Sequence, residues 1–256
     1  MYNVGEINNS MFGLRNFRGS CWVNACLQAF YRFPETQKRY ETTQTTELDS
    51  ALQTIWKSKG ETGLESFFDT VKQVNLPVGR NIGDSHELFH YLCDQMNWLD
   101  SLCRFKTADI VRCQNCKNEN VKHDTQIEMN VHPTKPGMTM LDCLRDSVTP
   151  IVISDWICDK CKQSGCEKQL HMVTFPKALM VHLTSMGNPI SYPTQFKLNN
   201  RTYMLSSILC YNGSHWWCHS NIGNEWYTFD DQRVSIHDVR KTTQMRVLIY
   251  FCFGGE

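Results

Sequence analysis

The sequence predicts an α+β fold in which helices come first along the chain and strands follow. Two observations support this prediction. Apolar residues recur at helical spacing through roughly the first hundred residues. After about residue 105, short β-prone runs alternate with turns that carry cysteines, and the last sixty or so residues contain further β-prone runs.

The helical part begins with an apolar run that Pro34 ends, and Gly83-Asp84-Ser85 marks the start of its last helix. Helices are expected over residues 21–32, 47–58, 61–74 and 85–97. Strands are expected over residues 108–112, 125–131, 168–174, 178–183, 203–210, 216–222, 225–229 and 246–253. We therefore expect a helical part over residues 1–105, a cysteine-bearing β part over 106–177 and a β-rich part over 178–256, all within one catalytic domain.

Composition excludes several classes of protein. The 256 residues are 41% hydrophobic and 20% charged, which is typical of a globular protein. Lysine plus arginine and aspartate plus glutamate each total 26, so no basic excess points to nucleic acid. No apolar run is long enough to span a membrane, and no secretory signal is visible. With 13 cysteines, an odd number, we expect reduced thiols and a cytoplasmic or nuclear location.

Cys21 lies where a loop becomes a helix, directly after Gly19 and Ser20. A helix N-terminus favours the thiolate form of cysteine, which is the nucleophilic form. Asn16, five residues earlier, could donate its side-chain amide to a developing oxyanion. The plainer interpretation is that Cys21 is one more buried cysteine beside a helix start.

A histidine and two aspartates follow roughly two hundred residues later, at His215, Asp230 and Asp231. Cysteine first, then histidine and aspartate, is the order of the papain-like thiol hydrolases. His219 is a rival base, because residues 215 and 219 point to the same face of a strand. The aspartate pair taken alone would be interpreted as a solvated turn.

Two C-x-x-C pairs stand about forty residues apart, Cys113 with Cys116 and Cys158 with Cys161. Paired knuckles of this kind predict a tetrahedral Zn²⁺ site of four cysteines. The zinc would be structural, because four thiolates leave no open position for water. Cys166 and Cys143 are possible substitutes as ligands, and a redox dithiol is the alternative for either pair alone.

The segment from Gly13 to Gln28 resembles the cysteine box of the ubiquitin-specific proteases, Gly-Leu-x-Asn-(x)3-Thr-Cys-(x)2-Asn-(x)3-Gln. The matching residues are Gly13, Leu14, Asn16, Cys21, Asn24, Leu27 and Gln28. Three positions depart from the pattern: Arg18 replaces a glycine, Gly19 an asparagine or alanine, and Ser20 a threonine. The resemblance implies that Cys21 is the nucleophile and that Asn16 contributes to an oxyanion hole.

The segment from Tyr203 to Trp216 resembles the histidine box of the same family, with Ser214 in place of a glycine and Trp216 in place of a tyrosine. The position of His215 within this box selects it over His219 as the base. The string from Glu225 to Val234 is similar to the family's Trp-Tyr-x-Phe-Asp-Asp-x-x-Val. It implies that Asp230 orients the imidazole, and that Asp231 assists as an alternate orienter or through the oxyanion site.

Gly83-Asp84-Ser85-His86-Glu87 resembles the family's Gln-Asp-Ala-His-Glu segment. The resemblance implies that Asp84 pairs with an arginine in ubiquitin's C-terminal tail and that Glu87 belongs to the same substrate-binding segment. The alternative is helix capping by Asp84 beside solvated His86 and Glu87. The four cysteines match the zinc site of the family's fingers.

The resemblance implies a papain-like fold of the ubiquitin-specific protease type, with a helical thumb (1–105), zinc-ribbon β fingers (106–177) and a β-sheet palm (178–256). It also implies a deubiquitinase that hydrolyses bonds after the C-terminal glycine of ubiquitin or a ubiquitin-like modifier, and whose partners are the conjugates. One alternative is a viral papain-like protease that cuts a polyprotein at Gly-Gly-like sites, and another is a non-catalytic ubiquitin-binding module. The compact, divergent sequence suggests a viral source, acting in the host cell.

Overall fold

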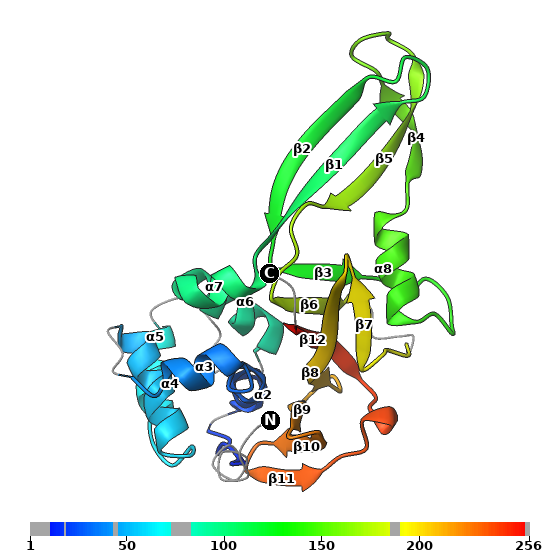
Figure 1. Ribbon diagram of the computed structural model, residues 1–256. Coiled ribbons are helices and arrows are strands. Elements are labelled where there is room, and N and C mark those ends of the chain that lie inside the picture. The colour runs from blue at the N-terminus through cyan, green and yellow to red at the C-terminus, as the bar shows by residue number, and fades with distance from the viewer. Residues whose placement is uncertain (1–10, 18, 43–45, 73–82, 185–189, 254–256) are drawn as a thin grey trace. The chain divides into compact units, whose positions relative to one another are not determined.

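The computed structural model describes residues 11–17, 19–42, 46–72, 83–184 and 190–253 (Figure 1). The chain divides into two compact units, residues 1–95 with 205–249 and residues 96–204 with 250–256. Helices and mostly antiparallel strands occur together, so the predicted α+β class is confirmed. The boundaries predicted for thumb, fingers and palm stay a prediction.

The first unit contains five described helices, one of which is fully buried. They are α2 (Cys21–Phe30), α3 (Pro34–Arg39), α4 (Glu47–Lys57), α5 (Leu64–Lys72) and α6 (Ser85–Gln95). Every side chain of α2 is buried, including the polar Asn24 and Gln28. The helix α3 was not predicted, because we interpreted Pro34 as a stop. Proline also suits the first position of a helix, where its missing N–H is not needed, and Pro34 occupies that position.

The strands of the same unit form the part β11-β10-β9-β8-β12 of an eight-stranded sheet, whose order continues with β6 and β3. The strands of this part are β8 (Arg201–Tyr211), β9 (Trp216–Ile222), β10 (Glu225–Asp230), β11 (Arg233–Ile236) and β12 (Met245–Phe253), with a short 3-10 turn at Val239–Lys241. The strands β8 and β12 each contribute residues to both units. The helix α2 packs on β9 and β10, so the N-terminal helix lies directly against the strands of the histidine and aspartate segments.

The second unit contains a separate four-stranded sheet in the order β2-β1-β5-β4, whose strands lie side by side in Figure 1. The elements of the second unit are α7 (Asn97–Cys103), β1 (Phe105–Cys113), β2 (Glu119–Gln126), β3 (Glu128–Val131), α8 (Met140–Val148), β4 (Ile151–Ile157), β5 (Ser164–Met172), β6 (Ala178–Leu183) and β7 (Gln195–Leu198). The strands β3 and β6 pair in parallel, and β7 pairs with the first residues of β8. The prediction of one helix over 85–97 was wrong at its end, since α6 stops at Gln95 and α7 begins at Asn97.

The segment before α2 runs against the turn between β10 and β11. The Leu14 N–H donates to the Asp231 carbonyl at 2.9 Å, and the buried Gln28 side chain donates to the Phe12 carbonyl at 2.8 Å. Gly13 lies so close to this turn that a Cβ would stand 2.3 Å from the Gln232 carbonyl oxygen. Only glycine therefore fits at position 13, because any larger residue would push the segment away from the turn.

We expect Gly13→Ala to destabilise the protein by about 3 kcal/mol, the upper end of the range for overpacking, because the new methyl overlaps backbone that cannot rotate away. Urea unfolding measures the loss. Gly137→Ala is the control: Gly137 has φ +82° and open space around its Cβ position, so that substitution adds only backbone strain of about 1 kcal/mol. Equal losses for the two variants would show that the close approach at Gly13 is unimportant.

Candidate active site

Cys21 is the first residue of α2, and its side chain is only 3% exposed. Burial raises the pKa of its thiol, and the negative charge of Asp231 adds to the rise. The backbone N–H of Trp216 and that of Trp22 lower the pKa in part. The first N–H groups of α2 thus favour the thiolate, as expected, but desolvation outweighs them and the pKa of Cys21 is raised.

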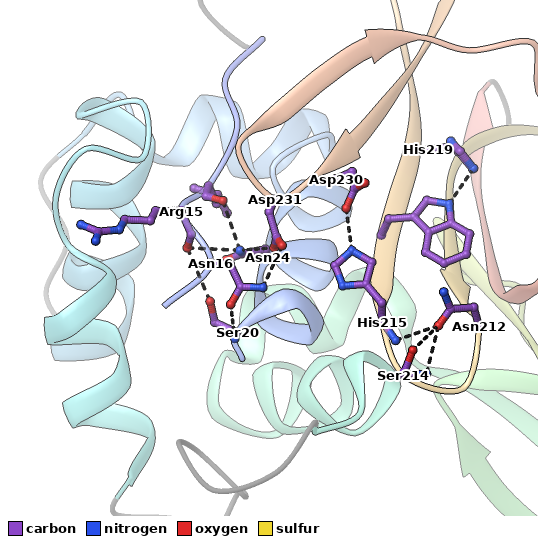
Figure 2. Close-up of polar contacts among 12 residues, drawn as sticks. Arg15, Asn16, Ser20, Asn24, Asn212, Ser214, His215, His219, Asp230 and Asp231 are labelled. Atoms are coloured by element: carbon purple, nitrogen blue, oxygen red, sulfur yellow. Dashed lines mark hydrogen bonds and ion pairs between the residues drawn. The ribbon is translucent and has the colours of Figure 1, made fainter. Parts of the chain in front are cut away.

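A tight loop leads into Cys21, and the Asn16 side chain holds it. The Asn16 Oδ1 accepts the N–H of Gly19 at 3.1 Å and that of Ser20 at 3.0 Å, while its Nδ2 donates to Asp231 Oδ2 at 2.8 Å (Figure 2). Gly19 has φ +82°, a conformation that glycine adopts without strain. An amide nitrogen has two N–H groups, so one bond to Asp231 leaves the second for a ligand. Arg18 lies outside the described residues.

The carboxylate of Asp231 is held by two asparagines from the N-terminal part of the chain. Besides Asn16, the buried Asn24 donates to Asp231 Oδ1 at 2.7 Å, and the same Nδ2 lies 3.2 Å from the Leu14 carbonyl and 3.3 Å from that of Arg15. Among the described residues, no hydrogen bond joins Asp231 to His215. Asp231 is thus hydrogen-bonded to the loop before Cys21, while its carboxylate also lies within 4.8 Å of a His215 ring nitrogen.

His215 follows a turn and stands just before β9. The Asn212 side chain shapes this turn by accepting the N–H of Ser214 at 3.0 Å and that of His215 at 2.8 Å. The His215 Nε2 lies 2.6 Å from Oδ1 of Asp230, the last residue of β10 (Figure 2). With the Nε2 proton donated to this carboxylate, Nδ1 is the nitrogen left to accept a proton.

Cys21 and His215 come from opposite ends of the chain and meet at the start of β9. The Cys21 thiol interacts with the backbone N–H of Trp216, the residue after His215. Within the described part of the chain, no hydrogen bond joins the thiol to the imidazole itself. Such bonds in cysteine and serine hydrolases are often long without substrate and tighten when it binds.

His219, the rival base, is already engaged at both ring nitrogens. Its Nε2 accepts the Trp217 indole N–H at 3.0 Å, and its Nδ1 lies 2.9 Å from Thr228 Oγ1. The ring stacks on His237 at 3.6 Å. Burial, with a smaller contribution from His237, lowers the pKa of His219 to about 3. These contacts favour His215 as the base and keep His219 neutral.

Trp217 is a residue of this site that sequence reasoning missed. Its indole ring lies nearly parallel to the His215 ring, with an interplanar angle of 18° and 6.3 Å between centroids, and its N–H is anchored on His219. The sequence carries no signal for this role, because an aromatic residue in a half-buried strand is ordinary.

Asp84 and Glu87 lie at the start of α6. The Asp84 Oδ1 accepts the His86 N–H at 2.8 Å, which is the capping contact of the alternative interpretation, and Glu87 is exposed. The Ser85 hydroxyl donates to the Trp22 carbonyl at 2.6 Å, so this helix start is tied to the residue after Cys21. A Cβ at Gly83 would stand 2.6 Å from the Trp22 ring, which explains why glycine replaces glutamine here.

The four predicted metal ligands converge in the second unit, with all their sulfur atoms within 4.8 Å of one another. The Sγ atoms of Cys113 and Cys161 are 3.6 Å apart, as are those of Cys116 and Cys158. A tetrahedral Zn²⁺ with Zn–S bonds of about 2.3 Å requires sulfurs about 3.8 Å apart, so the cluster fits zinc closely. The backbone N–H of Cys116 is the main cause that lowers the pKa of Cys113 to about 6, whereas burial and the neighbouring thiols raise the pKa of Cys116 to about 11, so the cluster without metal does not hold four thiolates.

The other candidate ligands lie outside this group of four. Cys166 opposes Cys113 in the β1–β5 pairing and packs against the cluster as a buried side chain. Cys143 is buried on α8.

Among the described helices, none has the length and apolar character needed to cross a membrane.

The lowered pKa of His219 makes a prediction about stability and pH. In the unfolded chain the imidazole of His219 binds a proton near pH 6.5, whereas in the folded chain it binds one only near pH 3. The free energy of unfolding therefore falls as the pH drops between these values. His219→Gln should make this fall shallower by roughly 1 kcal/mol per pH unit, measured by urea unfolding from pH 6.5 to 4. The control is His123→Gln on the exposed β2. An unchanged pH dependence in His219→Gln would contradict the assignment.

Comparison with known proteins gives matches along nearly the whole chain. The sequence model of the family described as ubiquitin carboxyl-terminal hydrolase matches residues 12–251. Ubiquitin carboxyl-terminal hydrolase 47 of Drosophila melanogaster is 26% identical over 219 residues, which cover 74% of this chain and 14% of that protein. Ubiquitin carboxyl-terminal hydrolase 2 of Bos taurus is 23% identical over 312 residues, covering 87% of this chain and 52% of that protein. The chain thus spans about a seventh of the length of the first relative and about half of the length of the second.

Solved structures share the fold. A chain of the SAGA DUB module Ubp8/Sgf11/Sus1/Sgf73 bound to ubiquitin aldehyde has a TM-score of 0.86 at 16% identity, over 100% of this chain and 72% of that chain. The module bound to monoubiquitin gives the same TM-score, identity and coverage. The predicted fold of the ubiquitin-specific protease type is therefore confirmed. Because the family model matches from residue 12 to residue 251, this chain belongs to the ubiquitin carboxyl-terminal hydrolase family.

Proposed function

We propose that this chain is a cysteine-dependent deubiquitinase that hydrolyses peptide and isopeptide bonds after the C-terminal glycine of ubiquitin or a ubiquitin-like modifier. The observation that carries the proposal is the meeting of Cys21 with the start of β9, where His215 is bonded to Asp230 at 2.6 Å. Family membership supports it, as do two structural neighbours whose names include ubiquitin aldehyde and monoubiquitin.

In the proposed reaction, His215 acts first as base and then as acid. Its Nδ1 takes the thiol proton of Cys21 as the sulfur attacks the carbonyl carbon, and Asp230 stabilises the imidazolium. The imidazolium then gives its proton to the leaving amine, and a thioester remains on Cys21. Water, deprotonated by His215, hydrolyses the thioester and releases the carboxylate and the free thiol.

Asn16 is the proposed oxyanion donor, together with backbone N–H groups at the start of α2. Its second amide N–H is available for the oxygen that becomes negative in the tetrahedral intermediate. Asp231 is an auxiliary residue in this proposal, because it fixes the Asn16 amide through the 2.8 Å hydrogen bond. It therefore acts on the oxyanion side of the site and not as an alternate orienter of the imidazole.

Asp84 and Glu87 are the proposed substrate-binding carboxylates. One oxygen of Asp84 is used by the His86 N–H, so its other oxygen and the exposed Glu87 remain for a cationic substrate tail. The Ser85 bond to the Trp22 carbonyl keeps these carboxylates on a helix fixed beside the nucleophile.

Cys113, Cys116, Cys158 and Cys161 are the proposed ligands of a structural Zn²⁺. A bound zinc would join the end of β1 and the β1–β2 connection, which carry the first pair, to the β4–β5 connection, which carries the second. The presence of Cys21, His215 and Asp230 together favours catalysis over a non-catalytic binding module. The viral source and the cytoplasmic or nuclear location stay predictions.

Ubiquitin that carries a C-terminal electrophile tests the function. We expect a covalent adduct of one ubiquitin with the protein, seen by mass spectrometry, because the electrophile occupies the position of the scissile carbonyl. Cys21→Ala should form none, whereas Cys252→Ser, at a half-buried cysteine of the second unit, should react like the parent protein. Full adduct formation by Cys21→Ala would sink the mechanism, and reaction only with a ubiquitin-like modifier would change the substrate.

The two candidate bases give different outcomes with a ubiquitin C-terminal reporter substrate. His215→Gln should lower kcat by about 10²–10⁴-fold, because the thiol loses its proton acceptor. His219→Gln should retain most of the activity, since its ring is bonded to Trp217 and Thr228 and takes no proton from the thiol in the proposed reaction. If His219→Gln is the inactive variant, the triad is assigned wrongly.

The zinc proposal is tested by metal content and thermal unfolding. Elemental analysis should find one zinc per chain, lost in Cys116→Ser and kept in Cys143→Ser. Removing the metal with a chelator should lower the melting temperature by about 10 °C or more, because binding energy of a structural zinc is folding energy. Absence of zinc from the parent protein, or its retention in Cys116→Ser, would refute the site.

A further inference from the structure

The first two turns of α6 carry two histidines whose side chains are of a metal-ligating type and are separate from the cysteine cluster. The sequence there is His86-Glu87-Leu88-Phe89-His90, so the two histidines stand four residues apart. On a helix, that spacing places both side chains on one face, one turn apart. The same His-Glu-x-x-His spacing holds zinc on a helix in many metal-dependent hydrolases.

The two imidazoles converge through their Nε2 atoms. These atoms are 3.1 Å apart, and the ring centroids are separated by 4.5 Å. With an ion about 2.05 Å from each nitrogen, the nitrogen–ion–nitrogen angle would be about 98°, which lies between the octahedral and tetrahedral values. Shifts of a few tenths of an ångström would complete either geometry, so neither side chain has to change its rotamer.

The backbone beneath the pair is held by hydrogen bonds from its N–H groups, and both side chains are half-buried. The His86 N–H is bonded to Asp84 Oδ1 at 2.8 Å, and the Leu88 N–H to the Asp84 carbonyl at 3.0 Å. A rigid helix that already brings two ligand atoms together needs little reorganisation on binding, which favours affinity.

We propose that His86 and His90 form a bidentate site for a divalent transition-metal cation of the zinc and nickel class, with water completing the coordination. Imidazole nitrogens select such cations over Mg²⁺ and Ca²⁺, which prefer oxygen. Two neutral imidazoles bind more weakly than four thiolates, so this site fills after the cysteine cluster. Glu87 has no role in the proposal. The site belongs to α6 and goes beyond the proposed hydrolysis.

The competing interpretation is a simple hydrogen bond between two neutral histidines, in which one Nε2–H donates to the other Nε2. In that case the pair stabilises the helix turn and takes up no cation. The His215, Asp230 and Asp231 group is a second place where an added cation could bind. The experiment must therefore separate three outcomes.

The test is calorimetric titration of Ni²⁺ into the full chain, purified without a tag and with its metal content measured beforehand. We expect one Ni²⁺ per chain beyond the resident metal. His86→Gln and His90→Gln should each weaken this binding by about tenfold or more, because a monodentate site loses the chelate. His123→Gln, an exposed histidine on β2, and His215→Gln should bind Ni²⁺ like the parent protein.

A second readout needs no variant. In the parent protein, Zn²⁺ added beyond the resident metal should shift two histidine ring signals in the proton NMR spectrum and raise the melting temperature. The proposal is overturned if about 1 mM Ni²⁺ produces no binding, since such a site would be too weak to fill. It is equally overturned if His215→Gln abolishes the binding, or if both His86→Gln and His90→Gln bind Ni²⁺ unchanged.

Discussion

The site depends on one contact, the hydrogen bonds that two asparagine amides donate to the half-buried carboxylate of Asp231. Asn16 and Asn24 lie 215 and 207 residues before it in the sequence, and both donate to its oxygens. The Asp231 carbonyl also accepts the Leu14 N–H, so both the side chain and the backbone of Asp231 hold the segment before Cys21. Because Cys21 follows this loop and Asp230 precedes Asp231, the contact sets how the nucleophile faces the histidine and aspartate.

This arrangement has an electrostatic cost. Burial above all, and the Asp231 charge, raise the pKa of Cys21, which favours the protonated thiol. A neutral, buried thiol is a poor target for oxidants and alkylating agents. On the proposed mechanism, His215 must therefore take the proton as the substrate arrives, which makes the 2.6 Å bond between His215 and Asp230 more important than the helix N-terminus.

Local sequence patterns predicted most of the fold because α2, α4 and α6 carry apolar residues at helical spacing and the last sixty residues contain several β-prone runs. They missed β2 and β4, whose side chains are almost all exposed or half-exposed and therefore show no alternation. They also missed α8, although Thr139 and Asp142 form a capping box that the sequence displays. Motif register could name Cys21, His215 and Asp230. It could not place Asp231 against Asn24, because a left-handed turn at Asp231 and tertiary contacts set that bond.

A double-mutant cycle between Asn24 and Asp231 tests this account most directly. Asn24→Ala, Asp231→Ala and the double variant are compared by their free energies of unfolding and by their rates of adduct formation with an electrophilic ubiquitin. The account predicts a coupling energy of about 1–3 kcal/mol in unfolding, with both single variants slowing the adduct about as much as the double variant. Effects that add within about 0.5 kcal/mol would show that the two residues act independently and that the Asp231 contact does not assemble the site.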